Sequence, residues 1–302
     1  ILGECSAVYV LSASTEYEYL SLFGSLRLQR SFNQNNTTLS AGAAFSSDSL
    51  DPVGGVPVAL TVLQPRTADE NSTDGEDRSL RKTSESKTVT DLLIGVTQVI
   101  DEVSLFRVNL VLSQSSGYQT DPYKIVSVVG ADGEPLRYVR EGRPDSRSKV
   151  GIYGEYLRAF GSDTFKTSYR YLSDEWGSDS HTLEASYRWR MSENTYLEPQ
   201  LRYYLQDAAD FYRVALFDGE EQTMQEVSAD YRLGAMDAIT VGTQVGHTLR
   251  GGSELMFRVA YYVQTPDEEG VPQQAAAGLS KFGELVPETT AVMATFGYRF
   301  SL

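Results

Sequence analysis

Apolar and polar residues alternate along this chain in runs of about ten residues. The last run, 292–302, places a row of apolar residues on one face: Val292, Ala294, Phe296, Tyr298, Phe300 and Leu302. The opposite face carries Arg299 among mostly small or polar neighbours. Side chains of a β-strand point alternately to two faces, so the pattern predicts strands. Roughly ten residues is also the length with which a tilted strand crosses a bilayer.

The two faces of these runs differ in chemistry. In the run 183–190, Leu183 and Tyr187 oppose Glu184 and Arg188, and the same division recurs in 197–206, 226–232 and 254–264. A soluble sandwich would bury Val, Ile and Leu between its sheets, whereas Tyr and Phe oppose Arg, Glu and Gln here. Alternate charged positions need water, which a lumen supplies. We therefore predict an all-β fold: one closed antiparallel transmembrane β-barrel, residues 1–302.

The lengths of the connections predict the orientation, because such barrels have short periplasmic turns and long outer loops. Short turns are expected at 33–37, 101–102, 161–163, 192–194, 218–222 and 251–253. Outer connections are expected at 47–87, 117–147, 174–180, 206–210 and 266–288, with one short one at 234–237. The alternation requires 211–217 to be a strand and gives about 14 strands with both termini periplasmic. Within 117–147, segments 125–129 and 135–139 predict a small hairpin.

Aromatic residues cluster near the predicted strand ends. Phe160, Trp189 and Phe300 fall at the periplasmic ends, and the expected outer girdle consists of Tyr171, Tyr204 and Tyr262. Such girdles anchor a barrel at the depth of the lipid headgroups. The terminal strand with Phe296, Tyr298, Phe300 and Leu302 is the predicted recognition element for the barrel-assembly machinery.

Composition narrows the function classes. The net charge of −15 argues against a nucleic-acid partner, and no apolar run is long enough for a spanning helix. A single cysteine, Cys5, excludes an internal disulfide or a thiolate metal cage. Two histidines without a C-x-x-C-H motif argue against haem, so we expect no cofactor or metal. The beginning of the chain has no signal-peptide pattern, and 68–77 is an acidic loop with five carboxylates.

A mixed series of charges is expected on the lumen face. Its predicted members are Lys166, Arg170, Glu184, Arg188, Arg190, Glu198, Arg202, Arg213, Glu226, Asp230, Arg232, Arg258 and Arg299. Cross-strand pairing that braces the barrel is one interpretation. The other is a constriction that selects anions, because basic residues are in excess there and most acidic residues lie in outer loops.

The outer rim holds a second group of candidates: Asp174, Trp176, Asp179, His181, Asp210 and Tyr212. Loops that combine aromatic, acidic and basic groups often carry recognition, and a rim network that closes the barrel mouth is the structural alternative. His181 raises the question of acyl transfer. Ser180 is adjacent on a strand and faces the other way, so a nucleophile would have to come from Ser168 or Ser186. The other histidine, His247, is expected to face lipid or the interface.

Several phrases resemble an uncharacterised bacterial family of predicted outer-membrane proteins, a domain of unknown function. They are 116–124 (SGYQTDPYK), 143–147 (RPDSR), 169–171 (YRY), 174–177 (DEWG), 179–181 (DSH), 209–213 (ADFYR) and 230–233 (DYRL). The resemblance runs from about Thr15 to the end of the chain. It implies an outer-membrane barrel, with a family-like total of 16 strands if upstream strands are missing, and no activity or ligand.

The sequence thus predicts a barrel in the bacterial outer membrane that acts as a channel or substrate-specific conduit, not as an enzyme. One alternative is a plugged barrel that serves as scaffold for a periplasmic, lipoprotein or redox partner. The second alternative is an outer-membrane hydrolase that uses the rim histidine.

Overall fold

The computed structural model describes residues 5–63, 80–81 and 84–300 and consists mainly of one large antiparallel sheet. Twelve strands pair in this order: β1 (Cys5–Glu16), β2 (Tyr19–Phe32), β3 (Thr37–Leu50), β6 (Glu85–Asp101), β7 (Ser104–Gly117), β10 (Ser146–Phe160), β11 (Asp163–Asp174), β12 (Ser180–Arg190), β13 (Thr195–Gln206), β15 (Met236–Thr248), β16 (Glu254–Pro266) and β17 (Thr289–Arg299). Each strand thus pairs with its neighbours along the chain, as in an up-and-down meander. The all-β, antiparallel class predicted from the alternation is confirmed.

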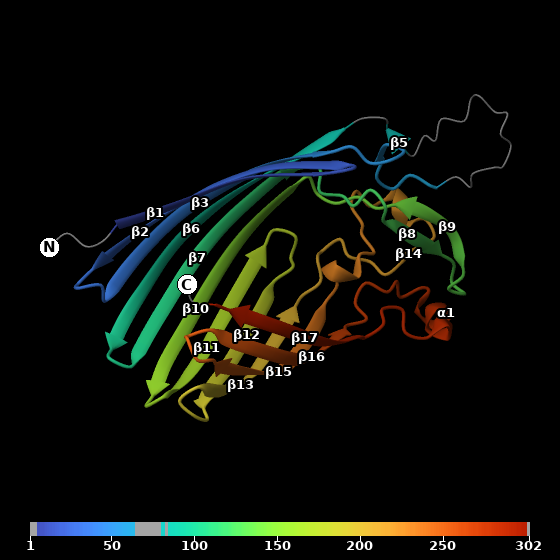
Figure 1. Cartoon of the computed structure of the whole chain (residues 1–302). Helices are drawn as coiled ribbons and strands as arrows, with labels where there is room; N and C mark the ends of the chain where they lie inside the picture. Colours follow the sequence, from blue (N-terminus) through green and yellow to red (C-terminus); the bar gives the residue numbers. More distant parts are fainter. Residues whose placement is uncertain (1–4, 64–79, 82–83, 301–302) are drawn as a thin grey trace.

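The sheet is strongly curved and forms a trough (Figure 1). Strand β1 lies along one rim, β17 lies along the other, and the long connections project from one end. Within the described residues these two strands are the edges of the sheet and do not pair with each other. Closure into a barrel therefore stays a prediction, and so does any strand beyond these twelve, including the family-like total of 16.

The alternation of short turns and long connections is largely confirmed. Five of the predicted short turns join strands at one end of the sheet, and the long connections 117–147 and 266–288 lie at the other, with the described part of 47–87. The predicted hairpin is also present, because β8 (Ile125–Val129) pairs with β9 (Pro135–Arg140). The acidic loop 68–77 lies outside the described residues.

One part of the predicted strand count is wrong. Segments 211–217 and 226–232 are not strands of the large sheet; they belong to one long connection between β13 and β15. Of these residues only β14 (Leu216–Phe217) is extended into a ladder, and it pairs with β8 in parallel. The expected turn at 218–222 contains the 3-10 helix η1 (Glu220–Gln222), and Tyr231–Leu233 forms another, η2. The expected short connection 234–237 runs into β15.

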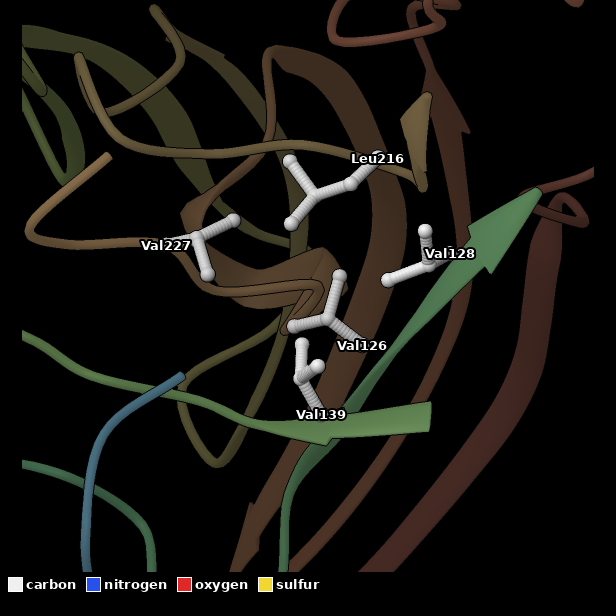
Figure 2. Packing of buried hydrophobic residues seen from close by; sticks show 5 residues of the cluster. All are labelled: Val126, Val128, Val139, Leu216 and Val227. Atoms are coloured by element: carbon white, nitrogen blue, oxygen red, sulfur yellow. The ribbon is translucent and has the colours of Figure 1, made fainter. Parts of the chain in front are cut away.

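The physical reason is a second apolar core outside the sheet. Val126, Val128 and Val139 of the hairpin pack against Leu216 and Val227, and all five side chains are fully buried. Figure 2 shows these side chains converging from the hairpin and from the two separate segments of the β13–β15 connection. Of the alternating segment 226–232, Val227 and Ala229 pack on this core, and sequence periodicity cannot distinguish this placement from a membrane strand.

We call the folded unit formed by residues 118–145, 207–235 and 267–288 the cap. A third cluster joins its parts, because Val129 and Ala215 pack with Ala275 and Leu279 of helix α1 (Ala276–Leu279) and its flank. Helix η3 (Ser280–Phe282) follows α1, and the short pair β4 (Val56–Pro57) and β5 (Leu80–Arg81) lies in the β3–β6 connection. No described helix has the length and apolar character to span a bilayer.

Candidate functional site

The polar row of β11, β12 and β13 forms one continuous charged surface. Lys166 is opposite Ser186, Glu184 is opposite both Ser168 and Arg202, and these partners therefore share a face. The residues on the other face, such as Leu183 (53% exposed) and Leu201 (51% exposed), are apolar. The polar row also lines a hollow in the trough. We call it the concave face.

Ion pairs cross neighbouring strands on the concave face. Arg188 Nε lies 2.7 Å from Glu198 Oε2, and Arg202 Nε lies 3.2 Å from Glu184 Oε1. Glu155 of β10 accepts two partners, since its carboxylate lies 3.1 Å from Lys166 Nζ and 3.3 Å from Arg107 Nη1. Such cross-strand pairs brace adjacent strands.

Tyrosine rings support the guanidinium groups of the same face. The Cζ atom of Arg188 lies 4.2 Å from the ring centroid of Tyr196, and that of Arg202 lies 5.3 Å from the ring of Tyr204. Arg170 lies 5.6 Å from the ring of Tyr153. Cation–π contacts of this kind hold the positive charge in place without neutralising it.

The hollow of 370 Å³ opens between β11 and β16. Lys166, Arg202 and Arg258 line it together with Glu184 and Glu198. Arg258 has Gln244 and Thr295 as its cross-strand neighbours, and among the described residues no carboxylate pairs with it. The arginine is therefore a positive group left for solvent or a solute.

The remaining predicted lumen charges fall into two groups. Arg299 pairs with Glu254 over 3.3 Å near the short-turn end, and Arg190 donates to the carbonyl of Glu193. The other four lie in the cap and not on the concave face: Arg213, Glu226, Asp230 and Arg232. Their assignment to the lumen is wrong for the reason given above, because their segments pack on the apolar core of the cap.

Asp230 is the centre of a buried charge network in the cap. Its side chain is 1% exposed and accepts a hydrogen bond of 2.9 Å from Arg143 Nη2 and others from Arg232, while Lys124 Nζ lies 3.8 Å away. Burial alone would raise the pKa of Asp230. The hydrogen bonds from the Arg232 side chain and backbone, with the charges of Arg232 and Lys124, hold the pKa at about 2.

Glu141 extends this network, and its side chain is fully buried. Its carboxylate accepts hydrogen bonds from the backbone N–H of Asp121 at 2.7 Å and from the Ser228 hydroxyl, and Arg143 Nε lies 2.8 Å away. The two buried carboxylates thus share Arg143 and join the β8–β9 hairpin to the β13–β15 connection.

Three of the six rim candidates form a second cluster at the base of the cap. Asp174 binds the guanidinium of Arg147 and accepts backbone hydrogen bonds from Trp176 and Ser178. Arg147 lies 4.1 Å from the Trp176 ring, and Trp176 meets Phe211 edge-on. Trp176, Phe211 and Tyr212 are buried in the same core cluster. Asp210 is exposed beside them and faces Gly177.

Asp179 and His181 belong to a different surface. The His181 ring lies against Tyr169 and Tyr171, with a hydrogen bond of 2.7 Å between Tyr169 Oη and His181 Nδ1. Asp179 accepts a hydrogen bond from Tyr171. Register places His181 opposite Tyr171, whereas Ser168 and Ser186 are on the concave face. The two serines therefore face away from the histidine. His247 is also on the outward row and contacts Thr195.

The aromatic girdle is only partly as expected. Phe160, Trp189 and Phe300 are half exposed or more at the short-turn end, together with Phe296 and Tyr298 of β17. Leu302 lies outside the described residues. The prediction for Tyr204 and Tyr262 is wrong, since both share the concave face with Thr240. Strand parity decides this, because Tyr203 and Tyr261 occupy the outward positions.

Sequence reasoning missed two charged residues that organise these sites. Glu155 lies on the same strand face as Tyr153, opposite to the outward Val150 and Ile152. The alternation of β10 could therefore have assigned Glu155 to the concave face. Glu141 ends the hairpin, and no local signal indicates that its partner Ser228 is 87 positions away. Among the described residues, no three His, Cys, Asp or Glu side chains gather closely enough to hold a metal ion.

Comparison with known proteins gives one family and several solved structures. A family model described as "Protein of unknown function (DUF3570)" matches residues 7–300, which confirms the resemblance to an uncharacterised family. No curated protein matches.

The chain is similar to three solved structures at low identity. CdiB from Acinetobacter baumannii shares 9% identity with a TM-score of 0.45, covering 98% of this chain and 48% of that one, so the chain spans about half of CdiB. OmpT of Vibrio cholerae, in its trimer form, shares 11% with a TM-score of 0.40, covering 98% and 96%. The β domain of the Bordetella autotransporter BrkA shares 10% with a TM-score of 0.32, covering 99% of each chain.

Proposed function

The chain belongs to the DUF3570 family, and we propose that it is an outer-membrane conduit for small solutes that prefers anions. The proposal includes closure of the sheet into a barrel, a lipid-facing convex side and periplasmic termini. Rows of exposed Leu, Val, Phe and Tyr on the outward face support the lipid contact, because a sheet face of this kind is otherwise costly in water.

The observation that carries the anion preference is the charge of the wall formed by β11, β12 and β13. Its concave face holds five basic residues against Glu184 and Glu198: Lys166, Arg170, Arg188, Arg190 and Arg202. Glu155 from β10 offsets one of them, and Arg107 restores the excess. In a narrow lumen the dielectric is below that of water, so uncompensated positive charge favours anions.

The acidic net charge of the chain does not contradict this preference. Acidic outer loops such as 267–269 lie beyond the sheet, and salt screens exposed charges within about 8 Å at physiological ionic strength. The stacked guanidiniums of Arg188 and Arg202 stay on the pathway, where screening is weakest.

The test is ion selectivity in planar lipid bilayers. Refolded, heat-modifiable protein is placed under a tenfold KCl gradient. Its reversal potential should be displaced from zero toward the equilibrium potential of chloride. The double variant Arg188→Gln, Arg202→Gln should move it at least halfway to zero. Arg158→Gln is the matched control, since Arg158 is exposed on the outward face at the short-turn end. Cation selectivity, or equal selectivity in both variants, would refute the anion preference.

A scaffold is the second candidate, and the cap supports it. The outer face of the β8–β9 hairpin exposes Ile125, Leu136 and Tyr138, which are between 41% and 54% exposed. A rigid unit with such a face could dock a protein partner. A correctly folded protein that never conducts would favour this candidate over the conduit. His181 lies on the outward face and Ser168 and Ser186 on the concave face, so this arrangement does not support a hydrolase.

A further inference from the structure

The hollow on the concave face has features that a passive lining does not require. It draws on five strands and has a volume of 370 Å³, within the range of about 300–1,000 Å³ typical of small-molecule sites. Gly242 lines the hollow, and its register partner on β16 is Ala260. A Cβ atom at position 242 would lie 2.9 Å from the Cβ of Ala260, so this position of the lining has no room for a side chain.

The charges around the hollow are unequal. Glu184 and Glu198 are already engaged by Arg202 and Arg188, and Lys166 is engaged by Glu155. Arg258 faces these strands from β16 with no carboxylate partner in the described part of the chain. The hollow therefore carries one excess positive charge. It lies on Arg258, whose guanidinium group has five N–H donors that suit an oxyanion.

The rest of the lining is hydroxyl and amide. Ser168, Ser186, Gln200 and Thr240 contribute, and the described lining includes no aromatic ring. Ala185 and Leu201 are the apolar members, and both belong to the outward row, so they contribute through their backbone positions. Such a lining matches a solute rich in hydroxyls and gives no stacking surface for a planar or apolar one.

We propose that this hollow is a binding subsite for a small hydroxylated monocarboxylate, an open-chain sugar acid in chemical class. Arg258 holds the carboxylate, and Gln200, Thr240 and the serines bind the hydroxyls. The subsite rests on the proposed conduit for its biological use, but its occupation does not depend on conduction.

The experiment uses gluconate as the probe, sorbitol as the neutral polyol of similar size and inorganic phosphate as an oxyanion without a hydroxylated chain. Binding is measured by equilibrium dialysis on the detergent-folded protein, and block of the chloride current is measured in bilayers. Gluconate should bind saturably and block the current, with sorbitol at least tenfold weaker. Phosphate should also be weaker, because it cannot use the hydroxyl-binding groups.

Arg258→Gln should weaken gluconate at least tenfold, and Arg258→Lys should restore part of the affinity. Thr240→Val should weaken gluconate binding severalfold. Arg299→Gln is the matched control, since Arg299 shares the concave face but lies outside the hollow. Equal affinity for gluconate and sorbitol, phosphate as the tighter ligand, or an unaffected Arg258→Gln variant would overturn the subsite. Binding in dialysis by a silent barrel would overturn the conduit and retain the subsite.

Discussion

Arg143 Nη2 donates a hydrogen bond of 2.9 Å to Asp230 Oδ2, although the two residues lie 87 positions apart. Their side chains are 11% and 1% exposed, so the pair is largely withdrawn from water. Arg143 also contacts Glu141, so one guanidinium group joins two buried carboxylates. A buried charge that loses its partner is costly, and the cap therefore depends on this arrangement.

The first prediction concerns Asp230→Asn. The change keeps the shape of the side chain but leaves Arg143 and Arg232 without their shared anion, so the cap should lose about 3 kcal/mol of stability. Native-state hydrogen exchange of the β8 and β9 amides measures the loss, and sheet amides should change little. Glu226→Gln is the control, because Glu226 is exposed in the same connection. Equal exchange in both variants would contradict the role of the buried network.

The second prediction is the pH dependence of the same cap. The pKa of Asp230 is lowered from 3.8 to about 2 in the folded state. The ionised carboxylate therefore contributes stability that is fully present above pH 4 and is lost as the pH falls through 2. The contribution is about 2 kcal/mol by linkage. Exchange of the cap amides should accelerate over this range in the wild type, and Asp230→Asn should lack that component.

The third prediction separates the two tryptophans. Trp176 is 3% exposed and donates through Nε1 to the Ser146 carbonyl, whereas Trp189 is 50% exposed on the outward row. In lipid vesicles, brominated acyl chains should quench a variant that retains only Trp189. A variant that retains only Trp176 should emit at shorter wavelength and resist quenching by bromolipid and acrylamide. Similar bromolipid quenching of both would show that the outward row does not face lipid.

The fourth prediction concerns Gly177→Ala. Gly177 has φ of +80°, and a Cβ atom there would lie 2.5 Å from Asp210 Oδ1. Backbone strain and displacement of the carboxylate together should cost about 2 kcal/mol. Gly161→Ala is the matched control, because its φ is +63° and no atom would meet the new Cβ within 4 Å. The midpoint temperature of thermal unfolding should fall more in Gly177→Ala than in Gly161→Ala. Equal midpoints would contradict the predicted clash with Asp210.

The sheet could be predicted from the sequence because its information is local. Parity along 254–264 or 183–190 assigns each side chain to a face, and short turns set the order of strands. The same parity assigned Arg188, Arg202 and Arg258 to one surface before any register was known. Their pairing with Glu198 and Glu184, and the isolation of Arg258, follow from register, which the sequence leaves open.

The cap could not be predicted, because its determinants are distant in sequence. Val227 alternates with polar residues as in a membrane strand, yet the surface that buries it, together with Leu216, is the β8–β9 hairpin. Asp230 was assigned to the lumen by the same periodicity, and only its contact with Arg143 reveals its place. Local pattern specifies that one face is buried and does not specify by what.

The shared core of the cap also has a consequence for the order of assembly. Val126, Val128 and Val139 are synthesised long before Leu216 and Val227, and the apolar face of the hairpin lacks these two partners until then. Closing such a long loop costs entropy before its contacts repay it. The cap should therefore mature after β7, β10, β11, β12 and β13 have paired. Until then the valine face of the hairpin stays exposed.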